Sequence, residues 1–381
     1  MGRATKGKDI GLALDLGTTT IKGLAVDLKS GRTVGKDTVF NPQNSLGTDV
    51  ITRIGAAIEG KYKELKELLM SGIEELQNRL GAQKPIFTAV VGNPVMLSFY
   101  LDKPVKGLGQ YPFKSELRDG VFLKNPNRYV FPIIGGFVGG DTIAGLLAGK
   151  VLNRQKTTLY VDLGTNGEVG LCHRGRVIVA STAAGPAFEG SGIKGGSLAI
   201  PGAIDRVGYQ GGFRIRTIRN RKPVGFCASG LLDLLAILLR LGWLTPDGRL
   251  VKAVEIGGIA IEQQAIRQLQ LAIGAIHVGI MVLLLKYSIT PAEISRVVLT
   301  GEFGAHLNPR SLVAVGLIPK GIKKITMASD LPLQGALKFL LDANGLEAVK
   351  LVHRNAHHLE LAQEPGFERL FIQSLRLAPW D

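Results

Sequence analysis

One short pattern occurs twice in this sequence: an apolar run followed by Asp-Leu-Gly-Thr. The first copy reads LDLGTTTIKG over residues 14–23, and the second reads VDLGTNGEVG over residues 161–170. Each aspartate ends a run with the composition of a β-strand, and each Gly-Thr pair then forms a turn. Chance is a poor explanation for two such segments in one chain. The repeat therefore predicts a duplicated α/β plan.

The segments around the two turns follow a similar order in each half. The first half is predicted to contain strands near residues 10–15, 21–28, 33–40, 87–92 and 130–134, and helices over about 50–80 and from Asp141 onward. The second half is predicted to contain strands from Thr157 onward and before Gly301, and helices over 228–243 and 258–287. We therefore expect a basic N-terminal stub (1–9), a first lobe (10–150) and a second lobe (151–381), packed around a cleft.

Composition narrows the class of protein. The chain has 381 residues, enough for two lobes that each bury a core, and 45% of them are hydrophobic. The two cysteines, Cys172 and Cys227, are not in a Cys-x-x-Cys arrangement. This excludes a disulfide framework and a self-contained iron–sulfur or zinc site, and it suits a reducing cytoplasm.

The most apolar long stretch is residues 269–287, which Gln270 and His277 interrupt. It falls short of the roughly 20 apolar residues that cross a bilayer, so we expect a buried core helix. The N-terminus runs from a short basic segment into a strand without the apolar region of a signal peptide. The sequence therefore predicts a cytoplasmic protein without a membrane partner.

The net charge of +15 does not indicate a nucleic-acid partner, because Lys and Arg are spread over the chain and aromatic residues make up only 6%. The one concentrated patch is FRIRTIRNRK, residues 213–222, where Arg214 and Arg216 alternate with Phe213 and Ile215. This alternation is typical of an edge strand whose charges prevent aggregation. A contact with an anionic protein or a phosphate ligand is the functional alternative.

The two turns have a residue set that suits phosphate chemistry. Glycine lets the backbone approach an anion, successive N–H groups form a nest, and threonine hydroxyls add donors. An aspartate at the strand end can hold Mg²⁺, partly through water. The predicted phosphate-binding residues are Gly17, Thr18, Thr19, Thr20, Gly164, Thr165 and Asn166, and the predicted metal-binding and catalytic carboxylates are Asp15 and Asp162. Facing each other, the turns would hold phosphates and metal, as phosphoryl transfer requires.

A third glycine turn, TGEFG, follows a later strand and could meet the nucleoside of a nucleotide; its predicted binding residues are Gly301, Glu302 and Gly304. One Asp-x-Gly-Thr turn would be a weak signal, but two together with this third turn are a strong one. The alternative is a pair of hairpin turns that kept the shape of an ancient duplication and lost its chemistry.

The order of these segments resembles the actin-like ATPase superfamily of sugar kinases, acetate kinases and heat-shock chaperones. It has a first phosphate turn at Asp15–Thr20, a connecting helix at Asp141–Ala148, a second phosphate turn at Asp162–Gly167 and an adenosine turn at Gly301–Gly304. The resemblance implies a duplicated, ribonuclease H-like, two-lobed α/β fold that binds ATP and Mg²⁺. In related sugar kinases the equivalent of Asp141 is the catalytic base, whereas helix capping alone would also explain an aspartate there.

Within this superfamily the chain resembles the ATPase part of the reductive activators of corrinoid proteins. The similar segments include NPQNSLGTDVITRI, GGFVGGDTIAGLLA, STAAGPAFEGSGIKGG and GFCASGLLDLLA, and the resemblance runs from about Ile10 to the C-terminus. In that family ATP drives the uphill transfer of an electron from an N-terminal [2Fe–2S] domain to an inactive cob(II)amide. The resemblance implies a corrinoid or other redox metalloprotein as partner, and a homodimer, the usual state among relatives.

The sequence departs from the family pattern in two places. It begins at the ATPase domain and carries no ferredoxin-like cysteine set, so we expect no iron–sulfur cluster in this chain and a separate ferredoxin-like electron donor. On the adenosine side, Ala265 and Ile273 stand where the family has an acid and a lysine, and MASDLPLQGA replaces its Gly-Asn-Ala segment. A non-catalytic nucleotide sensor or assembly subunit, and a small-molecule kinase with Asp141 as base, therefore remain alternatives.

The two cysteines allow a further comparison. Activators of 2-hydroxyacyl-CoA dehydratases share one [4Fe–4S] cluster across a dimer through two cysteines per subunit at helix starts. Cys227 does precede a predicted helix, where the helix dipole favours a thiolate, but Cys172 lies in a strand run. We expect both to be buried small residues, the commoner state of free cysteine.

Overall fold

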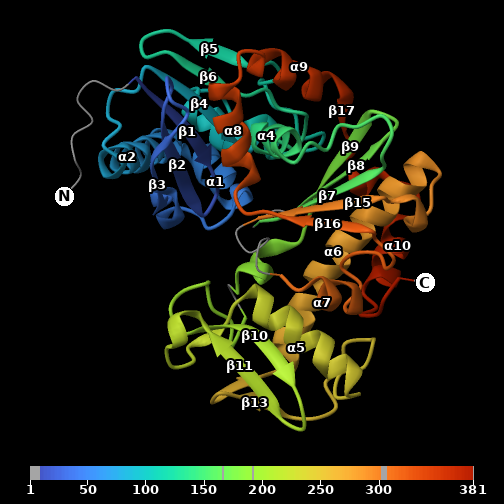
Figure 1. Ribbon diagram of the computed structural model, residues 1–381. Coiled ribbons are helices and arrows are strands. Elements are labelled where there is room, and N and C mark those ends of the chain that lie inside the picture. Colours follow the sequence, from blue (N-terminus) through green and yellow to red (C-terminus); the bar gives the residue numbers. More distant parts are fainter. Residues whose placement is uncertain (1–8, 165–166, 191–192, 302–306, 381) are drawn as a thin grey trace. The chain divides into compact units, whose positions relative to one another are not determined.

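The computed structural model describes residues 9–164, 167–190, 193–301 and 307–380, and it divides into two compact units (Figure 1). The first unit contains the chain up to Leu152 together with Asp330–His358. The second contains Asn153–Ser329 and the chain from Leu359 onward. The first boundary lies close to the expected one at residue 150, but the chain returns to the first unit for 29 residues that the sequence pattern assigned to the second lobe.

The sheet of the first unit has the strand order β3-β2-β1-β4-β6-β5. Its strands are β1 (Ile10–Leu16), β2 (Thr20–Asp27), β3 (Thr33–Phe40), β4 (Phe87–Gly92), β5 (Val121–Leu123) and β6 (Arg128–Val130). The central strand β1 pairs antiparallel with β2 and parallel with β4, so that Asp15 lies opposite Lys22 on one side and Val91 on the other. The first three predicted strands are therefore confirmed.

The helices of the first unit are α1 (Val50–Ala56), α2 (Tyr62–Leu80), α3 (Pro94–Tyr100), α4 (Gly140–Ala148), α8 (Leu331–Leu341) and α9 (Gly345–Asn355), and the short strand β17 (Ala356–His358) follows. The single helix predicted over 50–80 is interrupted at Ala57–Lys61, where Gly60 has a φ of 97° that a regular helix does not accommodate. The strand predicted over 130–134 is wrong beyond Val130, because Pro132 has no N–H to donate to a neighbouring strand.

The returning segment is tied to the first unit by an ion-pair cluster. Asp330 lies directly before α8, and its carboxylate accepts from Lys22 Nζ at 2.7 Å and from Lys36 Nζ at 2.6 Å. Burial acts to raise the pKa of Asp330, but the two lysines hold it below its usual value. Helix α8 packs against α4 and against strands β1 and β4, so it covers the sheet that carries the first turn (Figure 1).

The main sheet of the second unit repeats the arrangement around β1. The order β16-β15-β7-β8-β9 is built from β7 (Thr158–Leu163), β8 (Gly167–His173), β9 (Arg176–Thr182), β15 (Arg296–Thr300) and β16 (Lys324–Met327). Strand β7 pairs antiparallel with β8 and parallel with β15, as β1 does with β2 and β4. Both aspartates of the sequence repeat thus lie at the end of a strand with one hairpin neighbour and one parallel neighbour, and the predicted duplication is confirmed.

Smaller elements complete the second unit. They are the sheet β11-β10-β12 (Phe213–Thr217, Ala203–Tyr209, Gly225–Phe226), the hairpin β13–β14 (Val254–Ile256, Ile259–Ile261), and the helices α5 (Ala228–Arg240), α6 (Gln263–Tyr287), α7 (Pro309–Ala314) and α10 (Phe367–Ser374). The helix predicted from residue 258 begins only at Gln263. The residues before it form the hairpin, because the glycine pair at 257–258 favours a tight turn.

Helix α6 is the core helix of the second unit. Among the described residues it is the one helix long and apolar enough to cross a membrane, with a mean hydropathy of 2.0 over its most apolar 18 residues, but 72% of that window is buried in the protein. Its buried side chains join those of β7, β8, β15 and α5 in one cluster. The prediction of a buried core helix is therefore confirmed.

Protonation of His277, on α6, is expected to weaken the second unit at acid pH. The imidazole ring stacks on the ring of Trp380, with 4.1 Å between the ring centroids. The Nδ1 atom of His277 has no hydrogen-bond partner among the described residues, and burial lowers the pKa of His277 from 6.5 to about 4. Between these two pH values the unfolded chain binds a proton that the folded protein does not. The contribution of neutral His277 to the free energy of unfolding is therefore present in full above pH 6.5. It is lost as the pH falls toward 4, and the loss is up to about 2–3 kcal/mol.

The measurement is urea unfolding at several pH values, followed by tryptophan fluorescence. Both tryptophans of the chain, Trp243 and Trp380, belong to the second unit, so this signal reports that unit alone. His277→Phe should flatten the dependence between pH 6.5 and pH 4, and His357→Gln, at an exposed position, should not. An unchanged slope in His277→Phe would assign the effect to other groups.

Candidate functional site

The first turn connects β1 to β2 and has little room for side chains. Asp15 lies near the end of β1, half-buried, and Thr18 is 6% exposed. A Cβ on Gly17 would lie 2.6 Å from the carbonyl oxygen of Thr20, so only glycine fits this position. Gly17, Thr18, Thr19 and Thr20 therefore form one tight connection at the end of the strand that carries Asp15.

Two other segments of the first unit meet this turn. Asn93, at the start of α3, donates from Nδ2 to the Thr18 hydroxyl at 3.1 Å, and its Oδ1 caps α3 by accepting from the N–H groups of Val95 and Met96. Gly139 packs so closely that a Cβ there would lie 2.3 Å from the carbonyl oxygen of Gly92 and 2.9 Å from Asp141 Oδ1. The carboxyl ends of β1 and β4 thus bring the first turn, Asn93 and the start of α4 together.

Asp141 is not the cap of α4. The N-cap is Gly139, and the Asp141 carboxylate lies in the first helical turn, where Oδ1 accepts from the N–H of Thr142 at 2.7 Å. The interpretation of Asp141 as the N-cap residue of α4 is therefore wrong. The start of the helix still favours a negative charge there, because the helix dipole stabilises carboxylates in the first turn.

The second turn connects β7 to β8. Asp162 lies opposite Glu168 across the hairpin, and its Oδ2 accepts from the hydroxyl of Tyr160 at 3.1 Å. Gly164 is half-buried just after the strand. The predicted binding residues Thr165 and Asn166 lie outside the described residues.

The third turn begins beside the end of β7. Gly301 has a φ of 112°, and a Cβ there would lie 2.5 Å from the carbonyl oxygen of Leu163. The parallel pairing of Thr300 with Asp162 places β15 directly next to β7. The structure therefore brings Gly301 next to the second turn, while Glu302 and Gly304 lie outside the described residues.

The two family positions that differ on α6 both belong to the core. Ala265 is 1% exposed and Ile273 is fully buried, and both pack in the hydrophobic cluster of the second unit. These residues stand where the family resemblance implies an acid and a lysine. In this chain their side chains stabilise the unit by apolar burial instead.

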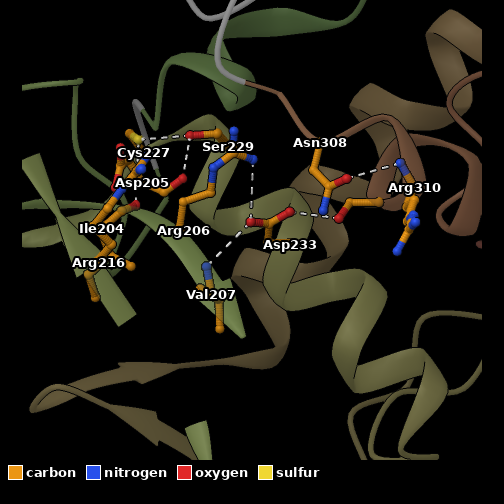
Figure 2. Close-up of polar contacts among 11 residues, drawn as sticks. Ile204, Asp205, Arg206, Val207, Arg216, Cys227, Ser229, Asp233, Asn308 and Arg310 are labelled. Carbon is orange, nitrogen blue, oxygen red and sulfur yellow. Dashed lines mark hydrogen bonds and ion pairs between the residues drawn. The ribbon is translucent and has the colours of Figure 1, made fainter. Parts of the chain in front are cut away.

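Figure 2 shows the polar contacts that hold α5 in the second unit. Asp233 is 3% exposed; its Oδ1 accepts from Ser311 Oγ at 2.6 Å and its Oδ2 from the N–H of Val207 at 3.3 Å, with Arg206 Nη1 at 3.9 Å. One carboxylate thereby joins α5, β10 and α7. Ser229, at the start of α5, donates to the carbonyl oxygen of Asp205 at 2.9 Å.

Both cysteines are buried and unbridged. Cys227 precedes α5 with its Sγ 3.4 Å from Ser229 Oγ, and Cys172 lies on β8, where burial raises the pKa of its thiol. Within the described part of the chain no group of three or more His, Cys, Asp or Glu side chains could hold a metal ion. The prediction that both cysteines are buried is therefore confirmed.

The basic segment forms the edge strand β11, where Arg214 and Arg216 are exposed and Phe213 and Ile215 are half-buried. The predicted alternation is confirmed. Arg216 is also paired with Asp205 through two hydrogen bonds of 3.0 and 2.6 Å, which neutralises part of the patch.

Sequence reasoning missed four polar residues that surround the first turn, namely Asn41, Asn44, Arg53 and Asn93. Asn41 and Asn44 belong to Asn-Pro-Gln-Asn, a turn-like segment directly after β3, which was the available signal. Arg53 lies in the family-like segment 41–54, but nothing in the local pattern predicts its burial, because an arginine on an amphipathic helix is normally exposed.

Comparison with known proteins agrees with this architecture. Residues 10–154 match the family model described as the RACo middle region, and residues 156–381 match the C-terminal domain of RACo, the ASKHA domain. The chain is 31% identical to "Corrinoid activation enzyme RamQ" of Eubacterium limosum, over 96% of this chain and 70% of that protein. It is 27% identical to "[Co(II) methylated amine-specific corrinoid protein] reductase" of Methanosarcina barkeri, over 96% of this chain and 76% of that one.

The solved structure of a "Reductive activator for corrinoid,iron-sulfur protein" superposes on the protein with a TM-score of 0.89. The two are 31% identical, and the match covers 99% of this chain and 67% of the other. The repeated strand arrangement, the two turns and these matches lead to one conclusion. The chain belongs to the RACo family of reductive activators and has its actin-like ASKHA fold.

Proposed function

We propose that the chain is a magnesium-dependent ATPase that couples its nucleotide state to the reductive activation of a corrinoid protein. The observation that best supports this proposal is that two relatives named for action on corrinoid proteins each match 96% of the chain. Electrons come from a separate ferredoxin-like iron–sulfur protein. The protein acts in the cytoplasm, and it does so as a homodimer. The alternative partner is another redox metalloprotein in place of the corrinoid protein.

Each unit offers donors of the types that bind Mg²⁺ and phosphate. Asp15 and Asp162 each present a carboxylate at the end of a central strand, half-buried, and oxygen is the ligand type that Mg²⁺ prefers. When bound, the ion would neutralise charge on the phosphates. Thr18 and Thr19 in the first unit, and Gly164 with Thr165 and Asn166 in the second, offer hydroxyl and backbone donors to phosphate oxygens.

Asp141 is the proposed base. It lies at the start of α4, close to Asn93 and the first turn, where its carboxylate can orient a water molecule and take its proton. Gly301, with Glu302 and Gly304, is proposed to contact the adenosine. The buried residues Ala265 and Ile273 stand in place of the acid and the lysine that the family resemblance implies, so we expect phosphate contacts to supply a larger share of nucleotide affinity.

The test is a reconstituted reduction of a cob(II)alamin-loaded corrinoid protein, followed by visible absorption, with a reduced ferredoxin as electron donor. One electron leaves the iron–sulfur cluster, and cob(II) becomes cob(I). We expect reduction that requires both the chain and MgATP, together with release of phosphate. Equal reduction without ATP would overturn the proposal.

A non-catalytic nucleotide sensor is the second candidate, which the altered positions 265 and 273 on α6 favour. Nucleotide binding in calorimetry, without turnover in any mixture, would identify it.

A further inference from the structure

A fully buried arginine lies behind the first phosphate turn. Arg53, on α1, is 0% exposed, and all five of its N–H groups donate. Its Nε donates to the carbonyl oxygen of Gly47 at 2.8 Å. Its Nη1 donates to Gln43 Oε1 at 3.0 Å and to the sulfur of Met96 at 3.4 Å, and its Nη2 donates to the carbonyl oxygen of Thr18 at 2.7 Å and to Asn44 Oδ1 at 2.6 Å.

The same network holds the neighbouring carbonyl groups of the turn. Asn41 donates from Nδ2 to the carbonyl oxygen of Gly17 at 3.0 Å and from its N–H to that of Thr19 at 2.9 Å. Asn44 Nδ2 also donates to the Thr19 carbonyl, at 3.3 Å. Three consecutive carbonyl groups, those of residues 17–19, are therefore bound by one connected set of side chains and backbone from the segment 41–53.

This arrangement determines where the amide groups point. In a trans peptide the N–H is antiparallel to the C=O of the same peptide plane. With the carbonyl groups of residues 17–19 turned toward the segment 41–53, the N–H groups of Thr18, Thr19 and Thr20 point away from it. Successive N–H groups directed to one side form an anion-binding nest. The network thus orients the donors that a phosphate group requires.

The charge of Arg53 favours the same ligand. None of the ion pairs among the described residues includes Arg53. Burial is the larger effect on its guanidinium and lowers the pKa to about 10, while the nearby carboxylate of Asp49 acts to raise that pKa, so the group remains charged near neutral pH. A buried cation without a carboxylate partner is costly. An anion on the other face of the turn, one peptide plane away, would offset this cost, whereas a purely packing role would be served better by an apolar side chain.

We propose that Arg53 is a positioning residue for the nucleotide phosphates. It bonds the Thr18 carbonyl, and through Gln43 and Asn44 it holds the network that orients the amide donors of Thr18, Thr19 and Thr20; it also supplies positive charge behind them. The inference rests on the proposed function, because it assumes that the first turn binds the β- or γ-phosphate of ATP. It predicts an effect on affinity that increases with the number of phosphates. A purely structural arginine would change stability without changing the relative affinities for ATP and AMP.

The experiment is calorimetric titration of the full chain and its variants with MgATP and with AMP. We expect Arg53→Met to weaken MgATP binding by about 100-fold and Arg53→Lys, which keeps the charge but loses the planar fork, by about 10-fold. Affinity for AMP should change less than about twofold in both. Arg128→Met is the control, because Arg128 is a half-buried arginine of the same unit that bonds to the hydroxyl of Tyr100 and not to the turn.

Asn44→Ala provides a second route if Arg53→Met does not fold. It removes one donor to the Thr19 carbonyl and one acceptor for Arg53, and about a fivefold loss of MgATP affinity is expected, with AMP unchanged. Wild-type protein that binds no nucleotide would overturn the proposed function and this inference with it. Wild-type binding with equal MgATP affinity in all folded variants, or equal losses for AMP and MgATP, would overturn the inference alone.

Discussion

Replacing Asp162 by asparagine is expected to lower the rate of ATP hydrolysis by at least about 100-fold, and replacing Asp15 by asparagine to have an effect of similar size. Each change removes one negative charge from the end of a central strand, β7 or β1, while keeping the shape of the side chain. The reason is electrostatic: a neutral amide holds Mg²⁺ less well than a carboxylate. The measurement is phosphate release at saturating ATP over a series of Mg²⁺ concentrations.

The matched control is Asp205→Asn. Asp205 belongs to the second unit, as Asp162 does, but its carboxylate pairs with the exposed Arg216 through two hydrogen bonds and has no place in the proposed metal site. Its hydrolysis rate should stay within about twofold of wild type. If Asp162→Asn or Asp15→Asn hydrolysed ATP as fast as Asp205→Asn, the assignment of these aspartates to the metal would be wrong.

The second large effect concerns the folding of the second unit. Asp233→Ala is expected to lower the free energy of unfolding by about 3 kcal/mol, because Ser311 Oγ and the N–H of Val207 both lose a buried acceptor and Arg206 loses its nearby carboxylate. Urea unfolding followed by tryptophan fluorescence measures it, since both tryptophans lie in this unit.

Asp233→Asn is the matched variant. It keeps the volume and one acceptor oxygen, so we expect a smaller loss, of about 1–2 kcal/mol. A loss below about 0.5 kcal/mol in Asp233→Ala would mean that α5 is held by apolar packing and that the contacts to β10 and α7 are secondary. The hydrogen bonds in Figure 2 would then contribute little to the free energy of unfolding.

The two buried charges of Asp233 and Arg53 have different surroundings. Asp233 is satisfied by partners within its own unit, which is the usual state of a buried charge in a stable fold. Arg53 is also fully hydrogen-bonded, but its partners are neutral carbonyl, amide and thioether groups. An excess charge of this kind close to a glycine turn is what an anion-binding site needs.

Local patterns account for what could be predicted of the fold. Strands β1 and β7 were predictable because a short apolar run that ends at Asp-x-Gly-Thr encodes a strand and a turn within ten residues. The predictions that failed depended on single residues inside otherwise periodic runs. Gly60 interrupts the helix predicted over 50–80, and Pro132 prevents the strand predicted after Val130.

The sequence by itself determined the duplication, the position of each aspartate at a strand end and the family, because all three depend on short patterns that repeat or match. Only the tertiary structure decided that Asp330–His358 returns to the first unit, that Ala265 and Ile273 are core residues, and that Arg53 is buried behind the first turn. These facts rest on contacts between segments far apart in the chain. Burial and hydrogen-bond partners arise from such contacts, and no periodicity along the chain encodes them.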